Sequence, residues 1–300
     1  MEIAQIDAFI AAADCGSFSR AAELLSVAQP SLSNRIQSLE REVGQPLFER
    51  MGRGVKLTDA GSAFLPYAQR AVRSLQEGVS VLQGTRDGSM GRLSIGTAPA
   101  VGTYVLPRLL KAFHDNHPGV DVQVRTGHSD DVLQMVLGDE VQVGLGRPIN
   151  HPEVHTIPLY RDALVLVVSS QHRYAKRGTV TVDDLGEEAL IVFDRDSSYY
   201  GMILGLFRNL GVAPHQVMYL DSIEATKKMV EQDLGIALLP AVSVDREIKL
   251  GTLHKVHVES PQPVEREVAM FYRRSKPQSG PMAAFLDLIA ELYGVTLPRR

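Results

Sequence analysis

The strongest constraint on the fold lies in residues 92–300, where short apolar segments alternate with longer amphipathic ones. The apolar segments have the length of buried strands, and the segments between them carry apolar residues at helical spacing. This alternation predicts an α/β architecture, in which helices cover parallel sheets. The expected strands span 93–97, 120–125, 141–145, 163–169, 190–194, 217–220, 236–239 and 268–272, and the expected helices span roughly 104–116, 129–138, 199–210, 222–232 and 281–293.

The first 58 residues have a helical pattern instead. Residues 3–13 carry apolar side chains on one helical face, and a second helix follows with Ser17 or Ser19 as its cap. A third helix is expected to begin at Pro30, because proline fits the first turn, where its missing N–H is no loss. Helix, tight turn and helix is the helix–turn–helix arrangement, although a generic three-helix core would have the same apolar pattern.

The third helix has one buried stripe and several polar faces. Leu32, Ile36 and Leu39 follow one another at spacings of four and three, which marks the buried stripe. Side chains on the other faces can hydrogen-bond base edges or phosphates, so we expect a recognition helix in a DNA groove. The side chains expected at DNA are Gln29, Pro30, Ser31, Ser33, Asn34 and Arg35, together with Ser17 and Ser19 at the start of the preceding helix.

Residues 44–58 predict a hairpin beside these helices, because glycines at 52 and 54 lie between short apolar strands. Arg50, Arg53 and Lys56 would face the sugar–phosphate backbone from this wing. Charge limits the interpretation, since the chain has a net charge of −4 and residues 1–58 hold six basic against seven acidic side chains. Affinity for DNA must therefore come from a local cluster of arginines rather than from a basic domain.

Five sequence blocks in this region resemble the winged helix–turn–helix of LysR-type transcriptional regulators. They are Ser-Phe-Ser-Arg-Ala-Ala-Glu-Leu-Leu at 17–25, Gln-Pro-Ser-Leu-Ser at 29–33, Leu-Glu at 39–40, Leu-Phe-Glu-Arg at 47–50 and Leu-Thr-Asp-Ala-Gly at 57–61. The resemblance implies that residues 1–58 are a DNA-binding domain that works in pairs. It places the third helix in the major groove of double-stranded DNA and the wing on the minor groove or backbone.

Residues 59–91 predict a long helix followed by a hinge. Apolar residues at 65, 68, 72, 75, 79 and 82 advance by alternating steps of three and four, as in a coiled-coil seam. A buried amphipathic helix would have the same pattern. A dimer of helix–turn–helix domains must fix the distance between the two DNA half-sites that it binds, so we favour dimerisation. The resembled family uses this segment as its dimerising linker helix. Glycines at 84, 88 and 91 end the helical pattern.

For residues 92–300 the resemblance implies two Rossmann-like α/β subdomains, joined by two crossing strands as in a periplasmic binding protein. Mapped onto this chain, subdomain I takes residues 92–161 and 268–300, and subdomain II takes residues 162–267. The family usually has an aspartate before the apolar run of the third strand, where this chain has Gln142. That departure puts only the local packing of the third strand in doubt.

Four strand exits in this region predict a ligand cleft. In open α/β sheets, ligands bind beyond the carboxyl ends of the strands, where helix N-termini present free N–H groups. The resemblance likewise places a small effector there. The residues expected to bind it are Thr97, Pro99, Ala100, Thr103, His128, Ser129, Arg147, Phe193, Asp194 and Ser197. Each hydroxyl among them could instead be an ordinary helix cap, but the four loops taken together favour the cleft.

Arg147 is the strongest candidate among these residues. A guanidinium group at the mouth of a cleft can bind a carboxylate through two parallel hydrogen bonds. The resemblance adds that some regulators of aromatic catabolism have an arginine at this position. The alternative is an ion pair with a neighbouring acid such as Asp194 or Asp196. We therefore predict a small effector that carries a carboxylate, an anionic metabolite.

The sequence contains no pattern typical of an enzyme. It lacks a Gly-x-Ser-x-Gly elbow, a phosphate-binding Gly-x-x-x-x-Gly-Lys-Ser/Thr loop and a His-Glu-x-x-His motif, so we expect no catalytic residues, metal or cofactor. The single cysteine, Cys15, excludes an intramolecular disulfide and fits a reducing compartment. No apolar run reaches the 18 or so residues that span a membrane, and the start does not resemble a signal peptide. A cytoplasmic protein is expected.

The resemblance, taken with these patterns, implies a LysR-type transcriptional regulator. It would bind an interrupted palindromic operator as a homotetramer, a dimer of dimers, and RNA polymerase is a further expected partner. Effector binding would close the cleft and change the spacing or bend of the DNA. The alternative is a solute-binding or sensing module without a direct transcriptional role, because residues 92–300 alone resemble a periplasmic receptor. The winged helix–turn–helix argues against that alternative.

Overall fold

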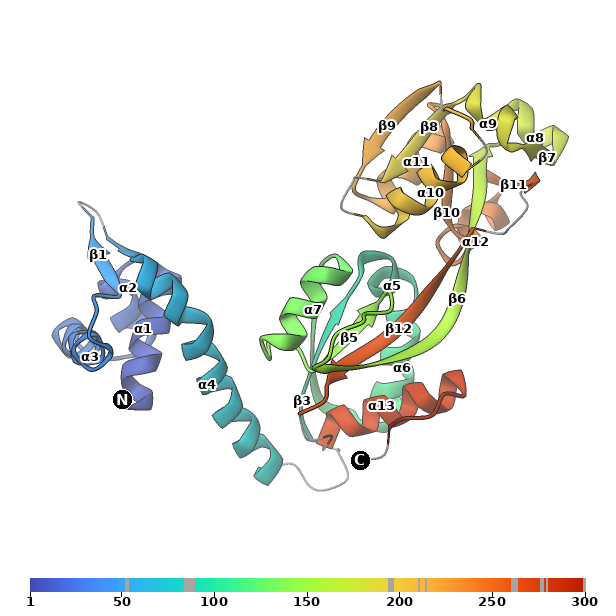
Figure 1. Ribbon diagram of the computed structural model, residues 1–300. Helices are drawn as coiled ribbons and strands as arrows, with labels where there is room; N and C mark the ends of the chain where they lie inside the picture. The colour runs from blue at the N-terminus through green and yellow to red at the C-terminus, as the bar shows by residue number, and fades with distance from the viewer. Residues whose placement is uncertain are drawn as a thin grey trace. The chain divides into compact units, whose positions relative to one another are not determined.

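The computed structural model describes residues 1–51, 54–83, 90–193, 197–209, 211–213, 215–259, 264–275, 278 and 280–298. The chain divides into two compact units, Met1–Thr85 with Gly138–Glu140 and Arg86–Leu137 with Val141–Arg300. Each unit has its own hydrophobic cores. Figure 1 shows the helices and strands of both units.

The first unit contains the helices and the hairpin that the sequence predicts. It has two hydrophobic clusters, one with Leu32 and Ile36 and the other with Phe9 and Leu39, and Phe9 packs against two further phenylalanine rings. The apolar stripe of the third helix therefore faces these clusters. In chain order the elements are α1 (Ile3–Cys15), α2 (Phe18–Leu24), α3 (Gln29–Val43), β1 (Phe48–Arg50), β2 (Val55–Leu57) and α4 (Asp59–Gln83).

The second unit alternates strands and helices, as expected. Its strands are β3 (Met90–Thr97), β4 (Gly119–Thr126), β5 (Val143–Gly146), β6 (Val154–Ser169), β7 (Thr179–Thr181), β8 (Ala189–Phe193), β9 (Gln216–Leu220), β10 (Ile236–Pro240), β11 (Leu253–Glu259) and β12 (Glu265–Arg273). Its helices are α5 (Pro99–Tyr104), α6 (Leu106–Asn116), α7 (Ser129–Leu137), α8 (Arg173–Arg177), α9 (Val182–Gly186), α10 (Ser198–Asn209), α11 (Ile223–Glu231), α12 (Ala241–Leu250) and α13 (Gly280–Tyr293).

The sheet of the second unit is mixed, because two antiparallel strands lie between the parallel strands of its two halves. The strand order is β4-β3-β5-β12-β6-β10-β8-β9, with β11 and β7 attached through β6. β3 is parallel to β4 and β5, and β8 is parallel to β9 and β10. β12 and β6, however, run antiparallel to each other and to their neighbours β5 and β10. These two strands carry the chain out of one half of the unit and back, so their directions must oppose.

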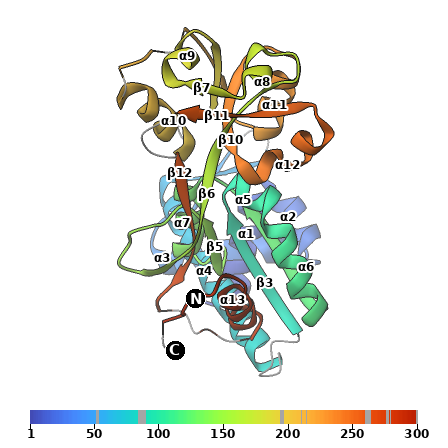
Figure 2. The same cartoon turned by 90° about the vertical axis from the view of Figure 1, so that its right-hand side faces the viewer.

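The two largest hydrophobic cores of this unit lie on the two halves of the sheet. The Phe285 core includes Leu93, Phe113, Met270 and Phe285, and the Val167 core includes Val167, Leu190, Ile203 and Leu238. β12 pairs with residues 154–163 of β6, and the two strands run from one half of the unit to the other (Figures 1 and 2). They correspond to the two crossing strands that the family resemblance implies.

Some elements were not predicted, or were predicted with different limits. β6 begins at Val154 rather than at residue 163, because its first half is only partly buried and shows no apolar run. The helix expected at 104–116 is two helices, α5 and α6, which meet at Val105. The short elements β7, α8 and α9, which span three to five residues each, are too short to show a clear period, and α12 and β11 were also not predicted.

The third strand keeps its packing without the family aspartate. Gln142, just before β5, accepts a hydrogen bond from the Ser94 backbone N–H through Oε1 at 3.1 Å. Its own backbone N–H donates to the Ser94 carbonyl oxygen at 2.9 Å. The glutamine amide therefore joins β5 to β3.

Candidate functional site

Helix α3 begins as the sequence predicts. Ala28 is its N-cap in an extended conformation, and Pro30 lies in the first turn. Among the residues expected at DNA, Gln29, Pro30, Ser31 and Asn34 are exposed, whereas Ser33 and Arg35 are half-buried. The buried stripe and the exposed polar side chains thus lie on different faces of one helix, which leaves hydrogen-bonding groups free on the outer face.

The two serines before α3 differ in their roles. Ser17 is the N-cap of α2, and its hydroxyl accepts a hydrogen bond from the Arg20 backbone N–H at 3.5 Å. The Arg20 guanidinium in turn donates to the Cys15 carbonyl oxygen at 2.6 Å, which fixes the turn between α1 and α2. Ser19 is exposed on the first turn of α2. A structural cap therefore accounts for Ser17, and Ser19 is the serine with a free surface.

The hairpin β1–β2 has the expected antiparallel register, with Phe48 opposite Leu57 and Glu49 opposite Lys56. Gly54 has φ +90°, and a Cβ there would lie 2.5 Å from the Gly16 carbonyl oxygen, so the turn requires glycine. Two predicted contacts, the Arg50 side chain and Arg53, lie outside the described residues.

A single carboxylate joins α3 to the wing. Glu40 Oε1 accepts hydrogen bonds from the backbone N–H groups of Leu47, at 2.8 Å, and Phe48, at 3.2 Å. These are charge-assisted bonds to the first residues of the hairpin. They set the position of the wing relative to the exposed face of α3.

The apolar seam of α4 has two parts. Leu65, Ala68 and Val72 pack against the core of the first unit, as a buried amphipathic helix would. Leu75 and Val79 are each 51% exposed, and the Leu82 side chain lies outside the described residues. The second part of the seam is therefore uncovered in the single chain.

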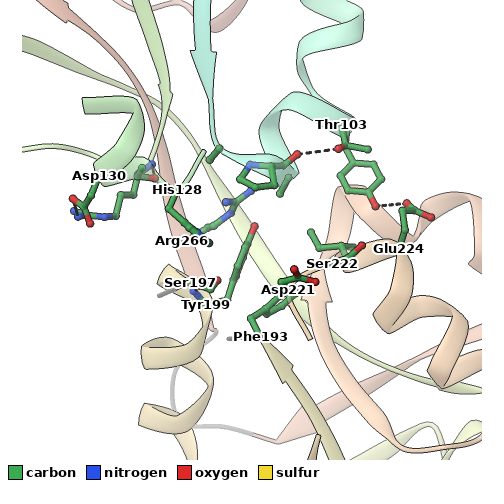
Figure 3. A pocket seen from close by; sticks show the side chains of 17 residues that line it. Thr103, His128, Asp130, Phe193, Ser197, Tyr199, Asp221, Ser222, Glu224 and Arg266 are labelled. Carbon is green, nitrogen blue, oxygen red and sulfur yellow. Dashed lines mark hydrogen bonds and ion pairs between the residues drawn. The ribbon is translucent and has the colours of Figure 1, made fainter. Parts of the chain in front are cut away.

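A cavity of about 270 Å³ lies in the second unit, between the Phe285 core and the Val167 core (Figure 3). It is lined from α5, the start of α7, the ends of β5 and β8, the starts of α10 and α11, and β12. Eight residues predicted from the strand exits line it: Pro99, Ala100, Thr103, His128, Ser129, Arg147, Phe193 and Ser197. Residues that were predicted from separate strand exits thus line one cavity.

Two predicted residues do not join this group. Thr97 is fully buried and does not line the cavity; its hydroxyl donates to the Ala98 carbonyl oxygen at 3.1 Å. Its methyl group would lie 2.7 Å from a Cβ at Gly102, so Thr97 packs inside the turn into α5. Asp194, like Asp196, lies outside the described residues.

Arg147 lies at the edge of the cavity in an ion pair. Its Nη2 is 2.5 Å from Asp130 Oδ1, and its side chain is 42% exposed. The pairing alternative is therefore present, with Asp130 as the described partner. The Arg147 backbone N–H also donates to the Ser129 hydroxyl at 3.2 Å, which ties the end of β5 to the start of α7.

A buried arginine lines the same cavity. Arg266 of β12 is 9% exposed, and its Nη2 lies 3.1 Å from Asp162 Oδ2 on β6. Its guanidinium carbon is 4.7 Å from the ring centre of Tyr199, a cation–π contact. Burial raises the pKa of the Asp162 carboxyl, and the charge of Arg266 opposes that rise.

The other side of the cavity has a polar chain that joins its two halves. The Tyr104 hydroxyl of α5 donates a short hydrogen bond to Glu224 of α11. Buried Lys227 lies 2.7 Å from Glu224 and 3.1 Å from Glu247 of α12. Burial, followed by the neighbouring Glu224, raises the pKa of Tyr104. Burial would also raise the pKa of Glu224, but its bonds to Lys227 and Tyr104 outweigh that effect and lower it.

The sequence could have revealed part of what was missed. Asp221, Ser222, Ile223 and Glu224 follow a predicted strand and open a predicted helix, so they are a fifth strand exit under the same rule. Tyr104, Tyr199 and Arg266 carry no such local signal. Arg266 stands between two glutamates on a strand, and nothing nearby in sequence indicates its partner.

No helix among the described residues has the length and apolarity needed to cross a membrane. The same part of the chain contains no group of three or more His, Cys, Asp or Glu side chains arranged to hold a metal ion.

Two protein-family models match the two units. Residues 3–62 match "Bacterial regulatory helix-turn-helix protein, lysR family", and residues 86–294 match "LysR substrate binding domain". The second match alone covers more than half of the chain.

Relatives of known sequence match over nearly the whole length. The "Uncharacterized HTH-type transcriptional regulator YwqM" of Bacillus subtilis is 31% identical over 296 residues, 98% of this chain and 100% of the relative. The "HTH-type transcriptional activator CmpR" of Synechocystis is 30% identical over 290 residues, 95% of this chain and 93% of the relative. Both are named as transcriptional regulators.

Solved structures have the same fold. Full-length CbnR in complex with its target DNA has a TM-score of 0.74 and 26% identity, covering 97% of this chain and 99% of that one. A full-length OxyR variant from Pseudomonas aeruginosa has a TM-score of 0.73 and 22% identity, covering 97% and 94%, which is a likeness of fold alone.

Proposed function

This chain belongs to the LysR family of transcriptional regulators, with a helix–turn–helix domain and an effector-binding domain, and we propose that it binds an interrupted palindromic operator in double-stranded DNA. In this proposal residues 1–58 bind DNA, 59–91 form the dimerising helix and hinge, and 92–300 bind the effector. The observation that carries it is the exposed polar face of α3, fixed beside the wing by Glu40. CbnR, which was solved with its target DNA, supports DNA as the partner.

The proposed DNA contacts divide into two kinds. Asn34 is exposed on α3 and can read a base through two hydrogen bonds, and Arg35 is proposed beside it. Gln29, Pro30, Ser31, Ser33 and Ser19 complete the proposed surface of the helices. Lys56 is exposed on the wing and is suited to phosphate contact, as are Arg50 and Arg53 by their place in the sequence.

We propose that operator binding takes a dimer of dimers. Leu75 and Val79 continue the seam of α4 beyond the core of the first unit, and both leave half of their surface exposed. A second α4 packed on this seam would cover them and would present two copies of α3 to two half-sites. Binding at a promoter places the protein in the cytoplasm with the DNA, and RNA polymerase is a further proposed partner.

The proposed effector is a small metabolite that carries a carboxylate. The cavity of about 270 Å³ has the size for a small molecule, and two arginines, Arg147 and Arg266, line it. An effector held between the Phe285 core and the Val167 core would shift how the two halves pack. The bound state would then alter how the paired α3 helices are presented to DNA.

Fluorescence anisotropy with labelled DNA from upstream of the nearest divergently transcribed gene tests operator binding. Asn34→Ala should weaken binding to this fragment by about 1–3 kcal/mol and leave binding to a scrambled fragment unchanged. Lys56→Ala should weaken both and lower the slope of log K against log salt concentration by about one. If the unmutated protein bound both fragments equally well, the proposal of a specific operator would be wrong.

A further inference from the structure

A buried ion pair lies on the two strands that join the halves of the second unit. Arg266 of β12 and Asp162 of β6 are direct partners in the antiparallel register. Their side chains are 8% and 5% exposed. Burying this pair removes both charges from water, which costs free energy. An N–H donor of the pair that stays without a hydrogen bond adds to that cost unless another group binds it.

The pair uses only part of the guanidinium. Nε and Nη2 of Arg266 both donate to a single oxygen, Asp162 Oδ2, at 3.3 and 3.1 Å. Nη1 has no hydrogen-bond partner among the residues that the structure describes. Arg266 lines the cavity, so this donor is available to a molecule bound there.

Tyr199 supplies a second unused donor beside it. The residue is 6% exposed and lines the cavity, and its hydroxyl has no hydrogen-bond partner within the described part of the chain. Figure 3 shows Tyr199 pointing from α10 towards Arg266, and the guanidinium lies 4.7 Å from its ring centre. Most buried hydroxyls in proteins are paired, so an unpaired one in a cavity indicates a partner that enters from outside.

The remaining charged groups of the cavity are occupied or repel an anion. Arg147 is bound to Asp130 and lies 42% exposed, where water weakens its attraction for an anion. Glu224 is held by Tyr104 and Lys227. Asp221, just before the N-cap of α11, lines the cavity, and its carboxylate makes no ion pair or hydrogen bond to another described residue. It therefore disfavours a second anionic group on that side.

We propose that the effector is a monocarboxylate whose carboxylate binds between the Tyr199 hydroxyl and the free edge of Arg266. This inference rests on the proposed effector-binding function and names the site and class of ligand. One carboxylate oxygen accepts from Tyr199, and the other accepts from Nη1 of Arg266. The ligand thereby contacts β12, one of the two strands that connect the Phe285 core with the Val167 core.

Isothermal titration calorimetry of the full chain with benzoate and lactate tests this carboxylate-binding site. Benzamide and lactamide are the neutral counterparts, and succinate is the dicarboxylate for comparison. Tyr199→Phe removes only the hydroxyl and should weaken binding of the two monocarboxylates about tenfold or more. Tyr200→Phe is the matched control, because Tyr200 is the next residue of α10 and does not line the cavity; it should leave binding unchanged.

The same variants give a test without ligand. Because the Tyr199 hydroxyl has no partner within the described part of the chain, Tyr199→Phe should unfold at the same temperature as the unmutated protein or at a higher one. A lower unfolding temperature would mean that the hydroxyl is already paired, and the proposed carboxylate-binding site would then be wrong.

The results of the titrations distinguish an error in the proposed carboxylate-binding site from an error in the proposed regulatory function. If the monocarboxylates bind Tyr199→Phe as tightly as the unmutated protein, or if Arg147→Ala alone abolishes their binding, the carboxylate is held elsewhere and the proposed carboxylate-binding site is wrong. If neither monocarboxylate binds the unmutated protein, or if the neutral amides bind equally well, the monocarboxylate class is wrong. Operator binding in the anisotropy assay would still stand in both cases.

Discussion

At the scale of single residues, Glu40 holds the wing beside α3. In the sequence Glu40 is the second residue of the Leu-Glu block that resembles the family, and it lies next to the buried stripe of α3. In the structure one of its oxygens receives two backbone N–H groups of the wing. A side chain on α3 therefore replaces hydrogen bonds that the chain between α3 and β1 would otherwise make with water.

Glu40→Gln tests this role. The amide oxygen accepts more weakly than a carboxylate, so the free energy of unfolding should fall by about 1–2 kcal/mol, as measured by urea denaturation. Operator affinity should fall with it, because the wing is no longer fixed beside α3. Glu23→Gln on α2 is the control, since Glu23 is exposed, and it should change neither quantity. Equal stability of Glu40→Gln and Glu23→Gln would contradict the role.

At the scale of elements, α4 combines two interpretations that the sequence left open. A buried amphipathic helix and a dimer seam have the same spacing of apolar residues. The structure assigns Leu65, Ala68 and Val72 to the core of the first unit and leaves Leu75 and Val79 half exposed. The first part of the helix therefore belongs to the fold of the single chain, and the second part is available for a partner.

The double variant Leu75→Glu and Val79→Glu should dissociate the assembly. Two carboxylates on each seam would be buried against two more in a dimer, which is strongly unfavourable. Light scattering after size-exclusion chromatography should give a lower mass at micromolar concentration, while circular dichroism keeps its helical signal. Ser74→Glu, on an exposed neighbour, should retain the mass of the unmutated protein. An unchanged mass for the double variant would mean that another surface holds the assembly together.

At the scale of the second unit, two polar contacts lie beside the cavity, and one of them connects the two halves. Arg266 and Asp162 join the crossing strands. Tyr104 of α5 joins Glu224 of α11, and buried Lys227 continues that chain to α12. Ala100 of α5 also packs with the Val167 core, although β3, which precedes it, belongs to the Phe285 core. The relative position of the halves is thus set by few groups, which an effector between them can change.

Tyr104→Phe removes one of these connections and leaves the Glu224–Lys227 ion pair in place. The free energy of unfolding should fall by about 1–2 kcal/mol, because a hydrogen bond to a carboxylate is lost. Urea denaturation measures this change. Tyr219→Phe, with a half-exposed ring on β9, is the matched control and should be neutral. If Tyr104→Phe is equally neutral, the hydroxyl contact does not help to hold the halves together.

The sequence by itself determined the features that depend on neighbours along the chain. The stripe of Leu32, Ile36 and Leu39 fixed which face of α3 is buried, because helical periodicity is a local property. The strand exits predicted about half of the residues that line the cavity for the same reason, because each exit is marked by the end of an apolar run and the start of a helix. Local pattern therefore gave the helices of the first unit and eight residues of the candidate site.

Only the tertiary structure decided which distant residues meet. Arg266 and Asp162 are 104 positions apart, and Tyr104 and Glu224 are 120 apart, so no spacing in the sequence relates them. The antiparallel direction of β6 and β12 had the same cause, since strand direction depends on how the chain returns between the halves. The chemistry of the cavity is set by such pairings, because a buried charge is defined by the partner that folding brings to it.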